Sequence, residues 1–218
     1  MQKMDIRLII LDFDGTLGDT RQNIVLTMQM TLREMGLPVR SEAECASTIG
    51  LPLAKCFDVL FPEIGESGAE RCAETYRRIF EVNKKKLVPG LFPKVRETLE
   101  MLYAKGFTLS VASSRTSKSL FEFLDEMGLS GMISFVVGAD EVVNAKPHAE
   151  PVIKILDALH FKADKALVVG DMAVDILMGV NASARTCGVT WGNGSEEELR
   201  KAGADYIIHS MDELLKIV

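Results

Sequence analysis

Apolar and polar positions divide the chain into two kinds of segment. Short, continuous apolar runs bounded by Gly, Asp or Ser are typical of strands buried on both faces of a parallel sheet. Such runs occupy residues 7–11, 109–112, 133–137, 166–169, 187–190 and 206–208. Between the later runs, apolar residues recur with helical spacing at residues 94–104, 118–127, 151–159, 175–182 and 196–201. This alternation predicts a three-layer α/β/α, Rossmann-like core whose sheet is mostly parallel.

One long stretch interrupts the alternation. Helical spacing without a strand-like run is found at residues 21–35, 42–49, 53–60 and 69–86. We therefore expect residues 19–88 to form an inserted helical domain and residues 1–18 and 89–218 to form the core. Because the insert follows the first strand directly, it should lie above the carboxyl edge of the sheet, where open α/β folds bind ligands. The pairs Gly18-Asp19 and Pro89-Gly90 are candidate hinges.

The charge balance and the apolar spans exclude several partners. The 218 residues include 25 Lys and Arg against 31 Asp and Glu, a formal net charge of −6. This charge repels polyanions, so we expect no nucleic acid partner. No span approaches the roughly 20 apolar residues of a membrane helix, so we expect no membrane partner and a cytoplasmic location. The four cysteines include no CxxC pair. Separately, we expect the protein to be a monomer or a weak dimer.

Two acids follow the first predicted strand. Asp12 and Asp14 are two positions apart, so their side chains should point to the same side. Like charges at this distance need a cation, and Mg²⁺ prefers oxygen ligands. Gly15, directly after them, would allow a ligand to approach the backbone closely. Considered without the rest of the chain, these acids could also form a solvated acidic turn with no metal.

Four more polar side chains follow later strands. Ser113 ends the run at residues 109–112, Lys146 follows the run at 133–137 after a loop, and Asp171 ends the run at 166–169 with Asp175 four residues on. Together with the two acids after the first strand, they should converge at one edge of the sheet. Carboxylates for a metal and for nucleophilic attack, a fixed cation and a hydroxyl donor are what phosphoryl transfer requires. Taken alone, Lys146 would be an exposed loop lysine and Ser113 a helix cap.

These motifs resemble those of the haloacid dehalogenase superfamily of phosphohydrolases. The resemblance rests on DFDGTL at residues 12–17, Ser113 after an apolar strand, Lys146-Pro147, and GDMAVD at residues 170–175. The four motifs occur in the family's order and with its spacing. The helical insert resembles the cap domain of the phosphoglycolate phosphatase and β-phosphoglucomutase branch.

The resemblance implies a role for each acid. Asp12 would be the nucleophile that forms an aspartyl-phosphate. Asp14 would protonate the leaving group and then activate water. Mg²⁺ would be bound by Asp12, the backbone carbonyl of Asp14 and Asp171. Asp175 would act indirectly, through a coordinated water or by orienting Lys146.

The resemblance also implies a phosphate site. Lys146, the Ser113 hydroxyl and the backbone amide of Ser114 would contact phosphoryl oxygens, with Gly15 close by. Gly50, in the loop at residues 48–52 of the insert, would approach the substrate. Arg115 stands where relatives commonly have a smaller or amide residue, and we expect this difference to leave the chemistry untouched but to be able to alter the mouth of the site or the motion of the cap.

The sequence therefore predicts a Mg²⁺-dependent phosphatase that acts on a small phosphorylated metabolite, with phosphoglycolate as the leading candidate. The alternatives from the same branch are a β-phosphoglucomutase-like phosphomutase and an inorganic pyrophosphatase. A more distant alternative is a non-enzymatic signalling module that resembles two-component receivers, which also use clustered acids, a hydroxyl and a lysine around Mg²⁺.

Overall fold

Six parallel strands form the central sheet of the computed structural model, which describes residues 5–84 and 89–218. The order across the sheet is β5-β4-β1-β6-β7-β8, and every neighbouring pair is parallel. The predicted runs agree with the strands to within two residues. The strands are β1 (Leu8–Leu11), β4 (Thr108–Ala112), β5 (Ile133–Val137), β6 (Ala166–Gly170), β7 (Arg185–Val189) and β8 (Tyr206–Ile208).

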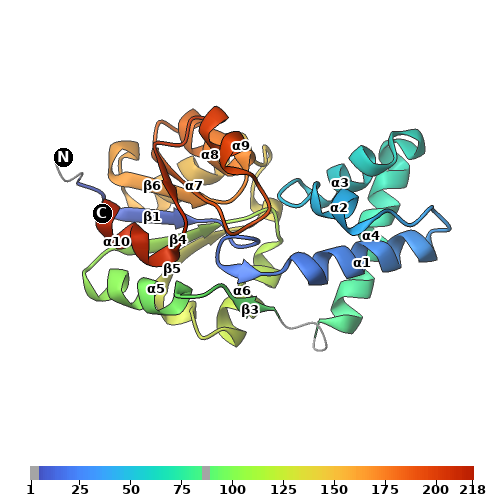
Figure 1. The fold of residues 1–218 in the computed structure, drawn as a ribbon, viewed down its shortest axis with the longest axis horizontal. Coiled ribbons are helices and arrows are strands. Elements are labelled where there is room, and N and C mark those ends of the chain that lie inside the picture. The colour runs from blue at the N-terminus through green and yellow to red at the C-terminus, as the bar shows by residue number, and fades with distance from the viewer. Residues whose placement is uncertain (1–4, 85–88) are drawn as a thin grey trace.

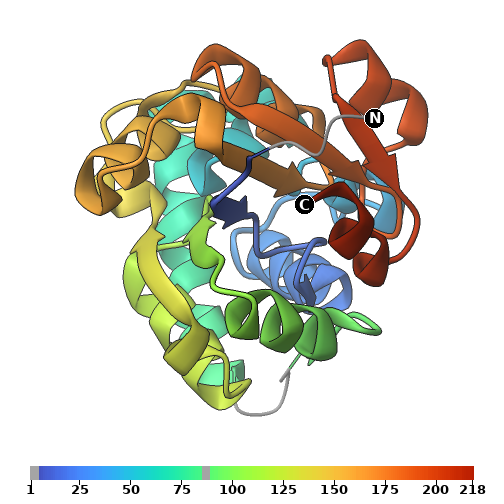
Figure 2. The same cartoon turned by 90° about the vertical axis from the view of Figure 1, so that its left-hand side faces the viewer.

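Helices cover both faces of this sheet. Strand β1 shows why its run is continuously apolar: Ile9 and Leu11 belong to one core cluster, and Leu8 and Ile10 belong to the other. In Figure 2, α5 and α8 lie on opposite sides of the strands. The three-layer α/β/α prediction is confirmed. The core helices are α5 (Val95–Ala104), α6 (Ser117–Glu126), α7 (Glu150–Leu159), α8 (Ala173–Asn181), α9 (Glu196–Lys201) and α10 (Leu214–Ile217).

Short 3₁₀ helices join several of these elements. They lie at Pro62–Ile64, Ser130–Met132, Ala139–Glu141, Ala163–Lys165 and Met211–Glu213. None of the helices within residues 5–84 and 89–218 combines the length and the apolar character needed to cross a bilayer.

Four helices form a separate group beyond one end of the sheet (Figure 1). They are α1 (Arg21–Glu34), α2 (Glu42–Ala46), α3 (Leu53–Leu60) and α4 (Gly65–Asn83), and they are called the insert below. Aromatic rings pack α3 against α4, with Phe57 edge-on to Tyr76 at a centroid distance of 6.3 Å. The C-terminus lies at the opposite end of the sheet from the insert (Figure 1).

Two helix boundaries in the insert differ from the prediction. Helix α2 ends at Ala46 rather than at residue 49, because single turns follow it and Gly50 has a φ of +97°. Helix α4 begins at Gly65 rather than at residue 69, directly after a 3₁₀ turn. Residues 85 and 86 of the predicted helix, and the insert boundary at residue 88, lie outside the described residues.

A second, two-stranded sheet connects the insert to the core. Strand β2 (Gly18–Asp19) pairs antiparallel with β3 (Gly90–Leu91). The pairing brings together the two segments that the sequence suggested as hinges, and hinge motion itself remains a prediction. Strands of two residues are too short to show a periodic pattern, so the sequence could not predict them as strands.

Candidate active site

Polar side chains from distant parts of the chain meet at the carboxyl edge of the large sheet. Asp12 follows β1, Ser113 follows β4 and Asp171 follows β6, while Lys146 comes from the loop after β5. Asp175 lies in the first turn of α8. All five residues are buried. Because parallel strands end at the same edge, this strand order places them together.

Lys146 lies at the centre of this group. Its Nζ donates hydrogen bonds to Asp12 Oδ1 at 2.5 Å and to Asp175 Oδ1 at 2.7 Å. The other oxygen of Asp175 accepts a hydrogen bond from the backbone amide of Met172. Burial alone would lower the pKa of Lys146, but the two carboxylates more than offset it and raise that pKa, so the amine stays charged. Lys146 is therefore a fixed cation rather than an exposed loop lysine.

Asp171 is held by partners that the sequence did not single out. Thr16 Oγ1 donates to Asp171 Oδ1 at 3.2 Å, and Asp171 Oδ2 accepts from the backbone and side-chain amides of Asn193 at 2.7 and 3.1 Å. Gly15 lies so close that a Cβ there would be 2.2 Å from Asp171 Oδ2, and its φ is +86°. Only glycine fits this position without strain. Asn193 follows β7, and this position after the end of a strand is the feature of the sequence that could have identified it as a site residue.

The acidic group fits a divalent cation. Asp12, Asp171 and Asp175 each offer a carboxylate oxygen within 4.8 Å of the others, and these three charges face the single cation of Lys146. Burial raises the pKa of Asp12, and it raises the pKa of Asp171 to about 7. Asn193 Oδ1 is also buried without a hydrogen-bond partner among the described residues. Excess buried negative charge and oxygen donors are what a hard cation such as Mg²⁺ requires.

The carboxylate of Asp14 has different partners. It does not belong to the candidate metal-binding group found among the described residues. Instead, Thr20 Oγ1 donates to Asp14 Oδ1 at 2.6 Å, and Arg115 Nε lies 2.8 and 2.7 Å from the two carboxylate oxygens. The two aspartates of the DFDGTL string therefore face different environments, one beside Lys146 and one beside Arg115.

Arg115 contradicts one expectation. We expected it to leave the chemistry untouched, but its guanidinium binds the carboxylate of the candidate acid, and both side chains are nearly buried, 11% and 12% exposed. The guanidinium carbon also lies 4.8 Å from the ring centroid of Phe123 and 5.5 Å from that of Phe80. The ion pair joins residues 101 positions apart, so no local pattern could reveal it.

Two adjacent serines follow β4, and the second of them contacts the insert. Ser113 Oγ accepts a hydrogen bond from the amide of Arg115 at 3.3 Å, and the helix cap is Thr116 rather than Ser113. Ser114 Oγ donates to the carbonyl of Gly50 at 2.7 Å. Gly50 in turn lies against Met172, so the loop of the insert reaches the edge of the acidic group.

A cavity of about 410 Å³ lies between the core and the insert. Asp14, Ser114 and Arg115 border it from the core, and Gly50 and Phe80 border it from the insert. It therefore adjoins Asp14, whereas Lys146 and the candidate metal-binding aspartates are not among its lining residues.

The match to a family model decides the family. The model of haloacid dehalogenase-like hydrolases matches residues 9–189, which include all of the side chains described above except Asn193. The chain belongs to this family. The receiver-like alternative is therefore disfavoured, because the family consists of hydrolases.

Several curated relatives of this haloacid dehalogenase-like hydrolase are similar over nearly their whole length. "Probable phosphatase IndB" of Dickeya dadantii is 34% identical over 95% of this chain and 91% of the relative. "Pyrophosphatase PpaX" of Halalkalibacterium halodurans is 32% identical over 99% and 98%. "Phosphoglycolate phosphatase" of Aquifex aeolicus is 30% identical over 98% and 97%.

A solved structure has the same fold. The crystal structure of "a predicted phosphatase from Clostridium acetobutylicum" is 27% identical, covers 97% of both chains and superposes with a TM-score of 0.89. The shared fold includes the insert, because the coverage extends across it.

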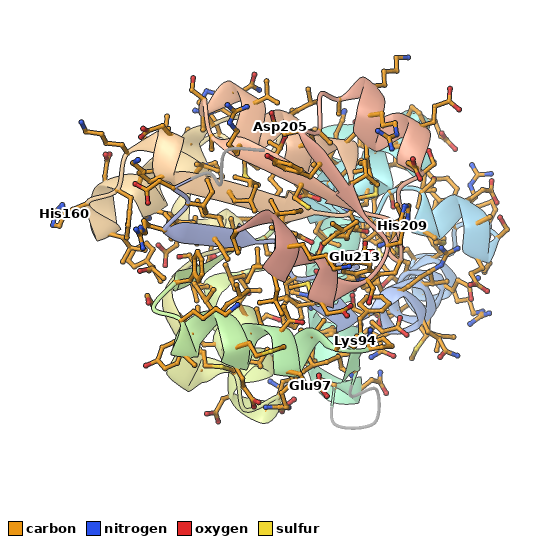
Figure 3. All side chains as sticks on the ribbon, turned by 60° about the vertical axis from the view of Figure 1, so that its left-hand side comes forward. Lys94, Glu97, His160, Asp205, His209 and Glu213 are labelled. Carbon is orange, nitrogen blue, oxygen red and sulfur yellow. The ribbon has the colours of Figure 1, made fainter. Side chains whose placement is uncertain are left out.

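The three histidines of this hydrolase lie outside the acidic group. His148, His160 and His209 are exposed. Figure 3 shows His160 projecting at the outer end of α7, and His209 Nδ1 lies 2.9 Å from Thr190 Oγ1. The candidate metal-binding group found among the described residues contains aspartates alone.

Proposed function

We propose that the chain is a Mg²⁺-dependent phosphatase that hydrolyses small phosphate monoesters through an aspartyl-phosphate on Asp12. The observation that carries the proposal is the contact of Asp12 with Lys146, in a buried group that also contains Asp171. A carboxylate beside a fixed cation can attack phosphorus because the cation offsets the repulsion between two anions.

In the first step, an Asp12 oxygen forms a bond to phosphorus while the bond from phosphorus to the leaving oxygen breaks. Asp14 donates a proton to that oxygen, and Arg115 and Thr20 hold its carboxylate in place. In the second step, Asp14 takes a proton from water, whose oxygen attacks phosphorus and releases Asp12. Lys146, the Ser113 hydroxyl and the Ser114 amide would bind the phosphoryl oxygens, beside Gly15.

Asp12, Asp171 and the backbone carbonyl of Asp14 would hold the metal ion. When bound there, Mg²⁺ neutralises charge on the nucleophile and on the transferred group. Asp175 has the separate task of positioning Lys146, which it contacts at 2.7 Å.

We propose that residues 19–88 act as a cap on a core of residues 1–18 and 89–218. The hydrogen bond from Ser114 to Gly50 supports this division, because it joins the candidate phosphate site to the insert. Closure of such a cap excludes bulk water from the acyl phosphate.

The names of the relatives suggest two substrates, phosphoglycolate and inorganic pyrophosphate. Hydrolysis of either substrate would use the same core residues. The two reactions differ in the leaving group that Asp14 must protonate. A phosphomutase would also share the core, but it would return the phosphoryl group to a sugar. Release of free phosphate, measured beside sugar-phosphate interconversion, separates these activities.

The direct test is to detect the covalent intermediate. Wild-type protein and Asp12→Asn are mixed with Mg²⁺ and a phosphate monoester panel, then quenched with borohydride, which reduces an acyl phosphate to an alcohol. We expect phosphate release that a chelator abolishes, and conversion of Asp12 to homoserine, detected by peptide mass spectrometry in the wild type alone. Turnover by Asp12→Asn above background would overturn the proposal.

A further inference from the structure

We propose that the leaving group of the substrate is an uncharged, largely apolar group of several carbon atoms, bound in the cavity between the core and the insert. This inference rests on the proposed phosphatase function. It concerns the group to which the phosphate is attached.

The position of the cavity identifies the part of the substrate that enters it. A general acid must lie within hydrogen-bond distance of the oxygen that it protonates. Asp14 borders the cavity, together with Ser114 and Arg115. The phosphoryl group would lie towards Asp12 and Lys146, so the group beyond the leaving oxygen extends into the cavity.

The walls on the insert side are mostly apolar. They come from α1, from the loop before α3, from α3 itself and from α4. Two of the lining side chains, Met28 and Ile49, are 1% and 3% exposed, so most of each is packed within the insert and only a small part faces the cavity. Burying apolar area against such walls is favourable in proportion to the area removed from water. The apolar residues in these walls include Ile24, Met28, Ile49, Leu51, Leu53 and Phe80.

The charges around the cavity disfavour a second anionic group on the substrate. Four acids border it, against two arginines. Arg115 is already neutralised by Asp14, and Arg77 is exposed on α4, which also contributes two of the acids. A carboxylate or a second phosphate placed here would lose water and face four acids, and the cation that is not paired with Asp14, Arg77, is exposed to solvent, which weakens its attraction. The four acids are Asp14, Glu70, Glu81 and Asp140.

The size of the cavity points the same way. Its volume of about 410 Å³ equals that of about a dozen waters at roughly 30 Å³ each. The leaving groups of phosphoglycolate and pyrophosphate have only five heavy atoms each and would fill a small part of it. A longer apolar group would contact the walls that these small anions leave exposed to water.

The test compares three phosphate monoesters of alcohols with pyrophosphate, whose leaving group is phosphate. Hexyl phosphate is apolar, ethyl phosphate is its small neutral control, and phosphoglycolate and pyrophosphate are the anionic alternatives. We expect kcat/KM for hexyl phosphate to exceed that for each of the others at least about tenfold. A preference for phosphoglycolate or pyrophosphate over hexyl phosphate would overturn the inference and leave the phosphatase proposal standing.

Three variants of α3 connect the preference to the cavity. Leu53→Lys places a cation in the wall, and we expect it to shift the ratio of kcat/KM values from hexyl phosphate towards phosphoglycolate by about tenfold. Leu53→Met keeps the wall apolar and should retain the wild-type ratio. Val59→Lys adds the same charge to the exposed part of the helix, outside the cavity wall, and should also retain it. A ratio shifted equally by both lysine variants would contradict a role for the cavity.

A binding measurement keeps the inference testable if no ester is hydrolysed. Hexylphosphonate and phosphonoacetate carry uncleavable C–P bonds, and calorimetry with Mg²⁺ gives their dissociation constants. We expect hexylphosphonate to bind at least about tenfold more tightly. Equal or weaker binding would overturn the inference, whereas tight binding without turnover of any ester would count against the phosphatase proposal alone.

Discussion

The acidic edge of the sheet and the cavity beside the insert are adjacent, yet they are built on opposite physical principles. At the edge, Lys146 and Asp171 are buried, and short hydrogen bonds to named partners fix their positions. In the cavity, most of the side chains that line the insert side are apolar, among them Leu51 and Leu53. The edge therefore constrains the geometry of one reaction, whereas the cavity constrains only the shape and polarity of a ligand.

This difference explains why similarity to known proteins establishes the family of this chain but leaves its substrate open. Relatives with different printed activities are similar to this chain over nearly their whole length. A reaction that depends on fixed charges tolerates little change, because a shift of one ångström is costly. An apolar cavity can change its lining gradually, so relatives with one chemistry can accept different substrates.

The strongest test of the edge is Lys146→Met. We expect kcat to fall about 10³-fold, because a fixed cation beside the transferred group is lost. We also expect the free energy of unfolding in chelator to fall by about 3–5 kcal/mol, because buried carboxylates lose their partner. Phosphate release and denaturant unfolding measure the two effects. Lys154→Met, which removes a half-exposed ion pair with Glu141, is the control and should cost less than about 1 kcal/mol.

Asp171→Asn tests the metal site separately from catalysis. In wild-type protein, Mg²⁺ at 100 times its dissociation constant should add about 2.7 kcal/mol to the free energy of unfolding. For a chain of this size that corresponds to roughly 5–10 °C in melting temperature. We expect the variant to lose this response. In chelator it should melt at or above the wild-type temperature, since it removes one charge from a buried acidic group.

Thermal melts with and without Mg²⁺ check this result. A variant that keeps the full response to Mg²⁺ would show that the ion binds elsewhere.

Arg115→Met tests the boundary between the two regions. Asp14 would lose a charged donor in a nearly buried setting, and we expect the free energy of unfolding to fall by about 1–3 kcal/mol. We expect kcat to fall about tenfold, because the carboxylate is no longer held in one orientation. Arg115→Lys retains the charge without the planar guanidinium and should recover part of both losses. Unchanged kcat in Arg115→Met would remove Arg115 from the site.

The smallest effect is expected for Ser114→Ala, which removes the hydrogen bond to the Gly50 carbonyl. Loss of this bond should cost about 1 kcal/mol, seen as a KM increase of about fivefold with kcat unchanged. Ser47→Ala removes a comparable hydroxyl bond inside the insert, to the carbonyl of Glu44, and should leave KM unchanged. An equal KM increase in both variants would indicate a general loosening of the insert.

The sequence alone was sufficient for the layers, the six strands of the large sheet and the grouping of acids at its edge. Continuous apolar runs and helical spacing depend on near neighbours, so they can be recognised without a structure. Asp12, Asp171 and Lys146 could be grouped because parallel strands carry their following residues to the same edge. Residues that follow the strands of a parallel sheet therefore lie close together in space even when they are far apart in the chain.

The tertiary structure alone decided which side chains touch. Arg115 meets Asp14 across 101 positions, and Ser114 meets Gly50 across 64. Both contacts depend on how the insert and the loops pack, and packing is set by many side chains at once rather than by any local pattern. The apolar walls of the cavity have the same origin, because the residues that line it come from separate helices whose spacing predicts only that they are helices.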